Sequence, residues 1–391
     1  MIQIVPKIRG DKVIWGVVII LSLFSLLAVY SSTTTLAYRY EHGNTEHFLF
    51  RHLGLLAFGL VLMYAAHKIK YVYYAKISML LIFIAAPLLL YTLIFGEVRN
   101  EAARWTTLPG TNITFQPSDL AKLALIMYVA SMLAKKQSNI KDLKSAFLPI
   151  LAPILIICGL ILPANLSTAA ILFVTCIVLM FIGGVKFRYL LALAGIGIAG
   201  LALMITFLMV SPKSSGRLGT WQNRIENFGG KGDSDETYQV DQAKIAIANG
   251  GFVGKLPGNS MQKNFLPNPF NDFIFAIIIE EYGAFGAGFI ILMYLILLYR
   301  GIRIAIKAPG NFGALLAIGV TISLVIQAFT NMAVAVHLVP VTGQPLPLVS
   351  MGGTSIWFTS IAIGIILSVS KEMDEVEGLK DEPTDQEYAA V

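Results

Sequence analysis

Long apolar segments recur along almost the whole chain, and they constrain its fold more than any other feature. An α-helix needs about 20 mostly apolar residues to cross the hydrocarbon core of a bilayer. The chain is 56% hydrophobic and 13% charged, against roughly 45–50% and about 25% in soluble domains. One water-soluble core cannot bury this excess, so the bilayer must be the solvent for much of it. The candidate spans lie at about 13–31, 49–67, 73–95, 117–134, 145–162, 167–185, 188–210, 271–299, 311–336 and 352–370.

These spans predict an all-α fold, a polytopic membrane protein with about ten transmembrane helices. The apolar stretch 145–185 is divided at 162–165, where the sequence Leu-Pro-Ala-Asn indicates a turn. Basic residues then predict the orientation, because Lys and Arg concentrate in short cytoplasmic loops. Connections rich in Lys and Arg alternate here with connections poor in them, which places both termini in the cytoplasm. The basic connections lie at 7–12, 68–76, 135–144, 186–188 and 300–307.

One large loop, 211–270, separates predicted helices 7 and 8, and the alternation places it on the extracytoplasmic side. Within it, residues 239–249 have helical character. We predict a membrane domain over residues 1–370 that includes this loop. Residues 371–391 are rich in Asp and Glu, which predicts a disordered cytoplasmic tail.

Charge and cysteine content argue against two kinds of site. The net charge is +6, but the basic residues lie in short loops where they set topology, so no nucleic-acid partner is predicted. Cys158 and Cys176 both fall inside apolar segments and are interpreted as small buried hydrophobic residues. No Cys pair, Cys/His cluster or HExxH pattern indicates a structural metal.

The start of predicted helix 4 contains the first candidate site. Pro117 suits a first helical turn, and Asp119 there complements the helix dipole. Lys122 lies three residues further on, so the two charges can pair on one helix face. This pair is either a structural ion pair or, with Arg104, an electropositive wall for a phosphate-bearing lipid.

The large loop contains a second candidate, Arg217 and Arg224. Seven residues apart, they share a face if that stretch is helical, and guanidinium groups suit a pyrophosphate. The alternative is that both are solvated loop charges.

The third candidate follows Lys263, where prolines at 267 and 269 keep the chain extended before predicted helix 8. Asn271 or Asp272 is a natural N-cap there, but Asp272 is also well placed as a general base at the membrane boundary. Glu280 and Glu281 are expected about 12–13 Å deeper. Buried carboxylates need a partner, and Lys122 or a backbone donor could serve.

The fourth candidate is the outer connection 340–355, which is uncharged and rich in Pro and Gly. Irregular backbone within a membrane is tolerated only when it is buried in protein or lines a cavity. The segment is therefore either a tight re-entrant turn packed on protein or a cavity wall. In the second case, Ser350, Thr354 and Ser355 would line the cavity together with the amides of the Gly-Gly pair.

The order of these motifs resembles the SEDS family, the bacterial shape, elongation, division and sporulation proteins typified by FtsW and RodA. The resemblance covers about residues 10–370 and is closer to the FtsW branch. The motifs that carry it are Arg104-Trp105, Phe115-Gln116-Pro117-Ser118-Asp119-x-x-Lys122, Phe265-Leu266-Pro267, Asp272-Phe273-Ile274-Phe275-Ala276, Glu280-Glu281-Tyr282-Gly283, Pro340-x-Thr342-Gly343-x-x-Leu346-Pro347 and Gly352-Gly353-Thr354-Ser355.

The resemblance implies a peptidoglycan glycosyltransferase of the bacterial inner membrane that polymerises lipid II on the extracytoplasmic side. It implies a class B penicillin-binding protein as partner, other divisome membrane proteins and a septal role. The family's essential aspartate corresponds to Asp272, and its helix-4 ion pair to Asp119 and Lys122. The further substrate-binding candidates are Arg104, Arg217, Arg224, Lys263, Glu281, Ser350, Thr354 and Ser355. No cofactor is firmly implied, although Mg²⁺ or Mn²⁺ could neutralise the pyrophosphate.

The sequence departs from the family pattern in three places. Asp119 replaces the usual Glu and is one methylene shorter. The stretch 163–168 contains no acid where relatives often carry Asp, and Met351 replaces a Tyr. Two other functions stay open: a lipid II flippase, and a non-enzymatic scaffold of the division complex. A scaffold would use Asp272 only as a helix cap.

Overall fold

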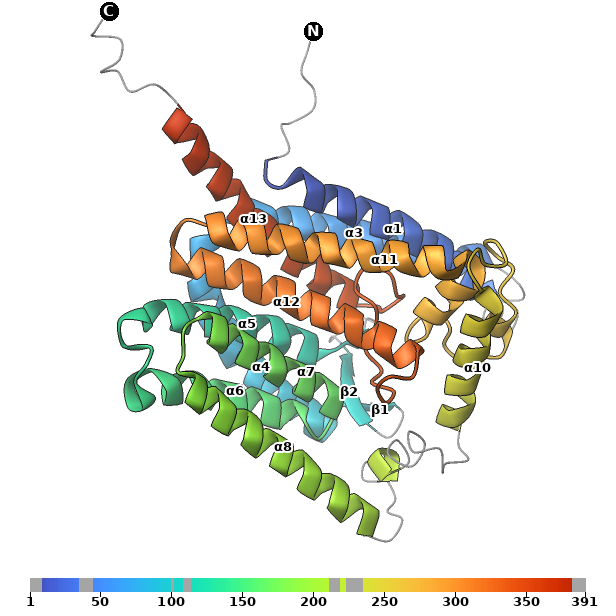
Figure 1. Cartoon of the computed structure of the whole chain (residues 1–391), viewed down its shortest axis with the longest axis horizontal. Coiled ribbons are helices and arrows are strands. Elements are labelled where there is room, and N and C mark those ends of the chain that lie inside the picture. The colour runs from blue at the N-terminus through green and yellow to red at the C-terminus, as the bar shows by residue number, and fades with distance from the viewer. Residues whose placement is uncertain are drawn as a thin grey trace, which may run out of the picture.

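The computed structural model describes residues 9–34, 45–99, 102–107, 114–210, 219–222 and 235–381. Figure 1 shows long helices lying side by side in one bundle. The start of α1 and the end of α13 lie at one end, which we call the terminal end. The β-strands and α10 lie at the opposite end, which we call the α10 end.

Nine described helical segments are long and apolar enough to cross a membrane, counting α6 together with the π-helical turn before it. A tenth apolar helix, α7, is shorter and has 17 residues, at the lower limit for a span. These ten elements confirm the predicted all-α polytopic fold. They are α1 (Lys12–Ser32), α3 (Thr45–Lys68), α4 (Tyr74–Phe95), α5 (Pro117–Lys135), α6 (Leu148–Ile161), α7 (Leu166–Ile182), α8 (Phe187–Val210), α11 (Ile274–Lys307), α12 (Gly310–Ala335) and α13 (Ser355–Asp381).

Local capping explains where several helices begin. Asp11 accepts hydrogen bonds from the backbone amides of Val13 and Ile14 at 2.9 and 3.1 Å, and so caps α1. Asn165 caps α7 by accepting from the amide of Thr168 at 3.2 Å. The predicted turn at 162–165 is therefore present.

Smaller elements complete the chain. Strands β1 (Glu97–Arg99), β2 (Ala102–Thr107) and β3 (Thr114–Phe115) form an antiparallel sheet between α4 and α5, where the sequence indicated only a loop. The predicted helical stretch of the large loop is confirmed as α10 (Asp235–Gly250). Short turns of 3₁₀ or π-helix lie at Tyr71–Tyr73, Gln137–Asn139, Leu143–Phe147 and Gln262–Asn264.

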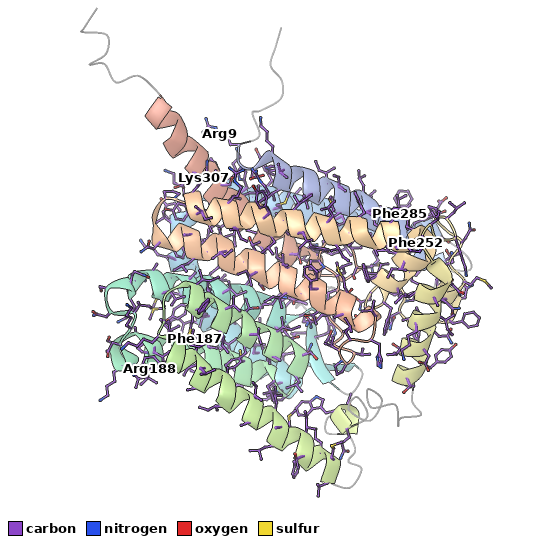
Figure 2. The ribbon with its side chains drawn as sticks, viewed as in Figure 1. Arg9, Phe187, Arg188, Phe252, Phe285 and Lys307 are labelled. Atoms are coloured by element: carbon purple, nitrogen blue, oxygen red, sulfur yellow. The ribbon has the colours of Figure 1, made fainter. Side chains whose placement is uncertain are left out.

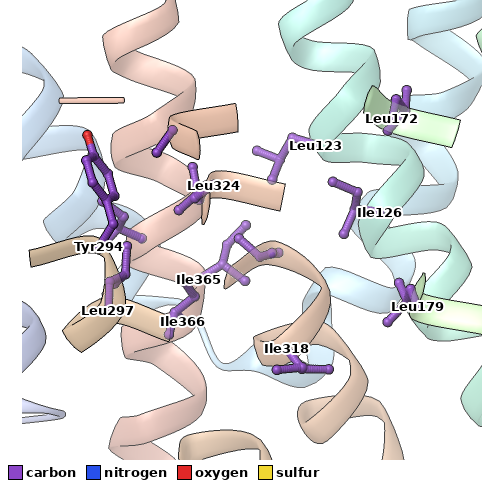
Figure 3. Packing of buried hydrophobic residues seen from close by; sticks show 14 of the residues in the cluster. Leu123, Ile126, Leu172, Leu179, Tyr294, Leu297, Ile318, Leu324, Ile365 and Ile366 are labelled. Carbon is purple, nitrogen blue, oxygen red and sulfur yellow. The ribbon is translucent and has the colours of Figure 1, made fainter. Parts of the chain in front are cut away.

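The core is built around α5 and α12, which are the most buried of the spanning helices. Figure 3 shows how Leu123 and Ile126 of α5 face side chains of α7 and α12, including Leu179 and Ile318. By contrast, α8 is largely exposed and lies at the edge of the bundle in Figure 1. The ends of α5 and α12 are therefore the most firmly fixed positions for polar side chains.

α11 differs from the single straight helix expected at 271–299. Gly283 has φ 66° and ψ −164°, so a short half-helix at 274–282 ends there and the rest of α11 follows. A Cβ at Gly283 would lie 2.2 Å from the carbonyl oxygen of Phe252, so the break needs glycine. Figure 1 shows the main part of α11 running from the α10 end to the terminal end.

This break reverses the predicted depth order of Asp272 and Glu280–Glu281. Ser25 of α1 donates to the carbonyl of Val349, in the loop that contacts Asn271, whereas Ser31 donates to the Glu281 carboxylate. Six residues of α1 correspond to about 9 Å, and Ser31 lies nearer the α10 end. The prediction that the glutamates lie deeper is wrong, because 274–282 runs toward the α10 end before the chain turns back at Gly283.

The C-terminal helix is longer than the sequence indicated. α13 continues to Asp381, beyond the predicted boundary of the tail at residue 371. The remainder of the predicted tail, 382–391, lies outside the described residues.

Candidate functional site

The predicted ion pair at the start of α5 forms. Lys122 Nζ lies 3.5 Å from Asp119 Oδ1 and donates a shorter hydrogen bond, 2.7 Å, to Gln327 Oε1 of α12. Asp119 is buried, and Ser355 from the start of α13 shares a cavity of about 20 Å³ with this pair. That is space for about one water molecule. The lysine is thus held as a paired cation within the protein.

Two amides of α12 connect this pair to the region of Asp272. Gln327 donates to the carbonyl of Pro345 at 2.9 Å. One turn further on, Asn331 donates to the carbonyl of Asp272 at 3.0 Å and to that of Gln344 at 2.8 Å. Residues four apart on a helix lie about 5–6 Å apart. The Lys122 ammonium and the Asp272 turn are therefore held by adjacent positions on one face of α12.

The connection 340–355 is packed on protein, as one of the two sequence interpretations required. Ser350 Oγ donates to the carbonyl of Asn271 at 2.7 Å and accepts from the amide of Leu346 at 2.8 Å. The amide of Met351 donates to the carbonyl of Phe270 at 2.9 Å. Leu348, which is buried, has φ 62°, a conformation that costs energy for a non-glycine residue and often occurs at functional sites. Thr354 is also buried.

Further contacts fix this connection to the helices around it. Gln344 donates to Thr168 Oγ1 of α7 at 2.6 Å. Ser25 of α1 donates to Val349 and is bonded to His52 Nε2 of α3 at 2.7 Å. The Ser25 proton goes to the Val349 carbonyl, so His52 donates from Nε2. The loop beside Asp272 is thereby tied to three helices.

Asp272 is half-buried in a series of turns just before α11. The helix begins at Ile274, its N-cap is Phe273, and no side chain caps it. The prediction that Asn271 or Asp272 caps this helix is wrong. The bonds from Asn331 and Ser350 hold both residues in turns that precede the helix.

A second buried cluster lies around Glu280. Lys255 Nζ is 3.0 Å from its Oε1, which also accepts from the amide of Met261 at 3.2 Å. Its Oε2 accepts from Ser260 Oγ at 2.5 Å and from the amide of Gln262 at 3.2 Å. The expected backbone donors are confirmed, but the cation is Lys255. Lys122 is not the partner, because Asp119 and Gln327 already hold it.

Glu281 and Lys263 lie beside this cluster. Glu281 Oε1 accepts from Ser31 Oγ and, at 3.4 Å, from the amide of Ser260. Lys263 is buried, and its Nζ donates to the carbonyl of Gly258 at 2.7 Å and lies 3.5 Å from Ser31 Oγ. These predicted residues therefore secure the segment 255–263 to α1 and to the half-helix of α11.

The predicted site residues thus fall into two groups and a remainder. Asp119, Lys122 and Ser355 share one cavity. Ser350 bonds the Asp272 turn at the carbonyl of Asn271, and the amides Gln327 and Asn331 of α12 connect that turn to Lys122. Lys263 and Glu281 form the separate cluster nearer the α10 end. Arg104 lies in β2, but the position of its side chain is outside the described part of the structure. Arg217 and Arg224 also lie outside the described residues.

Sequence reasoning missed the amides that organise the site, namely Gln327, Asn331 and Gln344. A signal was present, because Gln327 and Asn331 are polar residues four apart in an apolar spanning helix. Such residues usually face the protein interior. Within the described part of the chain, no three His, Cys, Asp or Glu side chains lie close enough together to hold a metal. The divalent cation stays a prediction.

The comparison with known families decides the chain's membership. Residues 11–375 match the FtsW/RodA/SpoVE family, described as cell cycle proteins. The chain belongs to this family. Stage V sporulation protein E of Bacillus subtilis is 34% identical over 373 residues, covering 93% of this chain and 98% of the relative. A probable peptidoglycan glycosyltransferase FtsW of Geobacter sp. strain M18 is 33% identical, covering 94% and 98%.

Two solved structures have a similar fold. A chain from a peptidoglycan synthase complex that coordinates polymerisation and crosslinking is 24% identical, with a TM-score of 0.74, covering 93% of this chain and 98% of that one. The rod shape determining protein RodA of Thermus thermophilus is 23% identical, with a TM-score of 0.65 and coverage of 94% and 98%. The fold of this chain is therefore similar to the folds of these two solved chains.

Proposed function

We propose that this protein is a peptidoglycan glycosyltransferase that polymerises lipid II into glycan strands, with Asp272 as general base. One observation carries the proposal. The Asp272 side chain does not cap α11, and Asn331 holds its carbonyl while Ser350 holds that of the residue before it. A carboxylate on a turn fixed from two sides is preorganised for proton transfer. The relatives named as probable peptidoglycan glycosyltransferases support the reaction class.

The reaction that fits this arrangement is a single displacement. The glucosamine 4-hydroxyl of the acceptor attacks C1 of the donor's muramyl unit, and Asp272 takes the hydroxyl proton. The new C1–O bond forms as the bond from C1 to the pyrophosphate oxygen breaks, and undecaprenyl pyrophosphate leaves with the electron pair. An α-linked donor then gives a β-linked product, as in other inverting transfers, without a covalent enzyme intermediate.

The leaving pyrophosphate gains negative charge, so the site needs a fixed cation. Lys122 supplies one, held by Gln327 one α12 turn from the residue that holds Asp272. A preorganised cation in a water-poor site stabilises developing charge far better than it would in bulk water. Arg104, Arg217 and Arg224 are further candidates for the same role, as is a divalent cation bound with the pyrophosphate.

The proposal includes a place and a partner. The protein lies in the bacterial cytoplasmic membrane with both termini inside and the α10 end outside, and it acts at the division septum. It works with a class B penicillin-binding protein and other division proteins. Support comes from the FtsW relatives and from a structural match to a chain of a peptidoglycan synthase complex.

The test is glycan synthesis from purified lipid II by the protein together with its cognate penicillin-binding protein. Wild type is compared with Asp272→Asn, which keeps the shape of the side chain and removes the base. General-base catalysis contributes about 10²- to 10⁴-fold, so polymer formation should fall by that factor. Asp241→Asn is the matched control, because Asp241 is an exposed acid on α10 that pairs with the exposed Lys244 at 3.2 Å.

Each outcome decides between functions. Loss of polymer in Asp272→Asn alone, with folding and complex formation intact, supports the polymerase with Asp272 as base. Equal polymer from both variants and wild type removes Asp272 from the chemistry. If no polymer forms even with wild type in an intact complex, the polymerase proposal fails, and transport of lipid II across vesicles then separates a flippase from a scaffold.

A further inference from the structure

A large apolar groove opens near the terminal end of the bundle, between the ends of four helices. Its volume is about 490 Å³, within the range of roughly 300–1,000 Å³ typical of small-molecule sites. α12 forms its floor, and α7 and α11 contribute its walls. The lining residues are Gln137, Ile182, Gly183, Leu298, Ile302, Ala305, Ile306, Asn311, Ala314, Leu315, Ile318 and Ile322.

The groove has the length of one half of a bilayer. On α12 its lining runs from Asn311 to Ile322, which corresponds to about 16 Å at 1.5 Å per residue. The hydrocarbon core of a bilayer is about 30 Å thick, so one leaflet accounts for about half of that. An apolar groove of this length within a spanning bundle suits an acyl chain of a single leaflet.

The polarity of the groove changes along its length. Its two polar lining residues, Gln137 and Asn311, lie next to the turns at the end of α5 and at the start of α12. Its other lining residues are aliphatic or glycine. The groove therefore has one polar opening at the terminal end and an apolar interior that extends toward the bundle centre.

The turns around that opening are strongly basic. Lys135 and Lys136 directly precede Gln137, Lys186 follows Gly183 by three residues, and Lys307 directly follows Ile306. Figure 2 shows Lys307 and Arg188 toward the terminal end, far from Phe252 and Phe285. The acid in these turns is Asp142, which accepts from the amide of Ser145 at 2.9 Å and so caps the π-helical turn. The net charge at the opening is thus clearly positive.

We propose that this groove is a binding site for an anionic phospholipid, with an acyl chain in the groove and the phosphate among the basic turns. Basic pockets between spanning helices on the cytoplasmic side bind anionic lipid headgroups. A polyprenyl chain would fill the same apolar space. It would make no use of the basic opening, however, because the lipid II headgroup in the proposed reaction lies at the opposite end of the bundle.

The test uses native mass spectrometry of the full-length protein in detergent, with phosphatidylglycerol or phosphatidylcholine of the same acyl chains added. Phosphatidylglycerol should be retained more tightly. Each lysine near a membrane surface contributes about five-fold to the affinity for anionic lipid, so Lys135→Gln/Lys136→Gln should weaken phosphatidylglycerol binding by roughly 25-fold. Phosphatidylcholine binding should not change.

Two further variants make the test specific. Ala314→Phe places a large ring in the groove with all charges intact and should reduce the binding of both lipids. Lys12→Gln/Lys76→Gln removes two exposed lysines that adjoin no lining residue and should leave the preference unchanged. Thermal unfolding and size-exclusion chromatography show whether each variant is folded. If the Ala314→Phe variant does not fold, the comparison of the Lys135/Lys136 variant with the Lys12/Lys76 variant still tests the proposal.

Three results would overturn the proposal. The first is equal retention of the two lipids by wild type. The second is an equal loss of phosphatidylglycerol in both lysine pairs, which would mean that the basic surface attracts lipid without a specific site. The third is displacement of bound lipid by undecaprenyl phosphate but not by phosphatidylglycerol, which would assign the groove to a substrate tail.

Discussion

Asn331 supports the Asp272 turn, and its replacement by Leu tests the proposed architecture of the site. The side chain is 1% exposed and donates to two carbonyls, those of Asp272 and Gln344, at 3.0 and 2.8 Å. Leucine has a similar size and donates to neither. A buried acceptor left without a partner costs about 1–3 kcal/mol, so loss of the bond to the buried Gln344 carbonyl should lower the unfolding free energy by about that amount, with a smaller addition from the half-buried Asp272 carbonyl.

The same substitution should reduce catalysis beyond its effect on stability. Without the bond from Asn331, the Asp272 turn can shift, and a displacement of about 1 Å can cost on the order of 100-fold in rate. The rate is measured with lipid II well below the temperature at which the variant unfolds. The loss should appear in kcat rather than KM, since Asn331 contacts the turn and not the substrate.

Thr330→Val is the matched control for Asn331→Leu. Thr330 is the neighbouring residue, and its hydroxyl donates at 2.8 Å only to Ile326 within the same helix. This variant should keep both the thermal midpoint and kcat near wild type. If Asn331→Leu is as stable and as active as Thr330→Val, then the bonds from α12 do not position Asp272, and the reasoning is refuted.

Three other substitutions test separate parts of the structure. Lys122→Met leaves the buried Asp119 carboxylate without its cation and should cost about 3–5 kcal/mol of stability, measured by denaturation in detergent. The double variant Lys122→Met/Asp119→Leu should recover most of that stability, and no recovery would show that the two residues are not coupled. Glu280→Gln removes the ion pair with Lys255 and replaces one of the two carboxylate oxygens that bond the segment 255–263. Limited proteolysis within that segment should become faster. Unchanged cleavage would contradict the anchoring role of Glu280. Gly283→Ala should lower the thermal midpoint much more than Gly288→Ala. A Cβ at 283 would lie 2.2 Å from the carbonyl oxygen of Phe252, whereas a Cβ at 288 has no atom within 4 Å. Equal midpoints would mean that the half-helix can form without this break.

Much of the fold could be predicted from the sequence, because the bilayer imposes a simple rule. Each span needs a long apolar run and polar ends, and both are visible without knowledge of tertiary contacts. The start of α5 at Pro117 and the turn before α7 are local in the same sense, as is the Asp119–Lys122 pair three residues apart. Local signals sufficed wherever the interacting residues were near in sequence.

The remaining features depend on residues far apart in the sequence. For the buried glutamates the sequence predicts either Lys122 or a backbone donor as partner, and the backbone donors are present. Lys255 could not be predicted, because it reaches Glu280 through a loop whose path no local pattern indicates. The expected cap at Asn271 or Asp272 failed for the same reason, since bonds from α12 and from Ser350 compete with helix initiation. Gly283 was visible, but one glycine in an apolar helix is ordinary, and its break requires the contact with Phe252.

The break at Gly283 also has a consequence for the proposed chemistry. Had 271–299 been one straight helix, Asp272 would lie at the membrane surface with the glutamates below it. Instead Glu280 and Glu281 fasten segment 255–263 near the α10 end. Asp272 lies further from that end, at the level of the Ser350 loop and one α12 turn from the Lys122 contact. A lipid-linked sugar is tethered to the membrane through its pyrophosphate. A base and a cation set below the outer rim can therefore reach the bond beside that pyrophosphate, whereas groups on the rim would face the distal part of the headgroup.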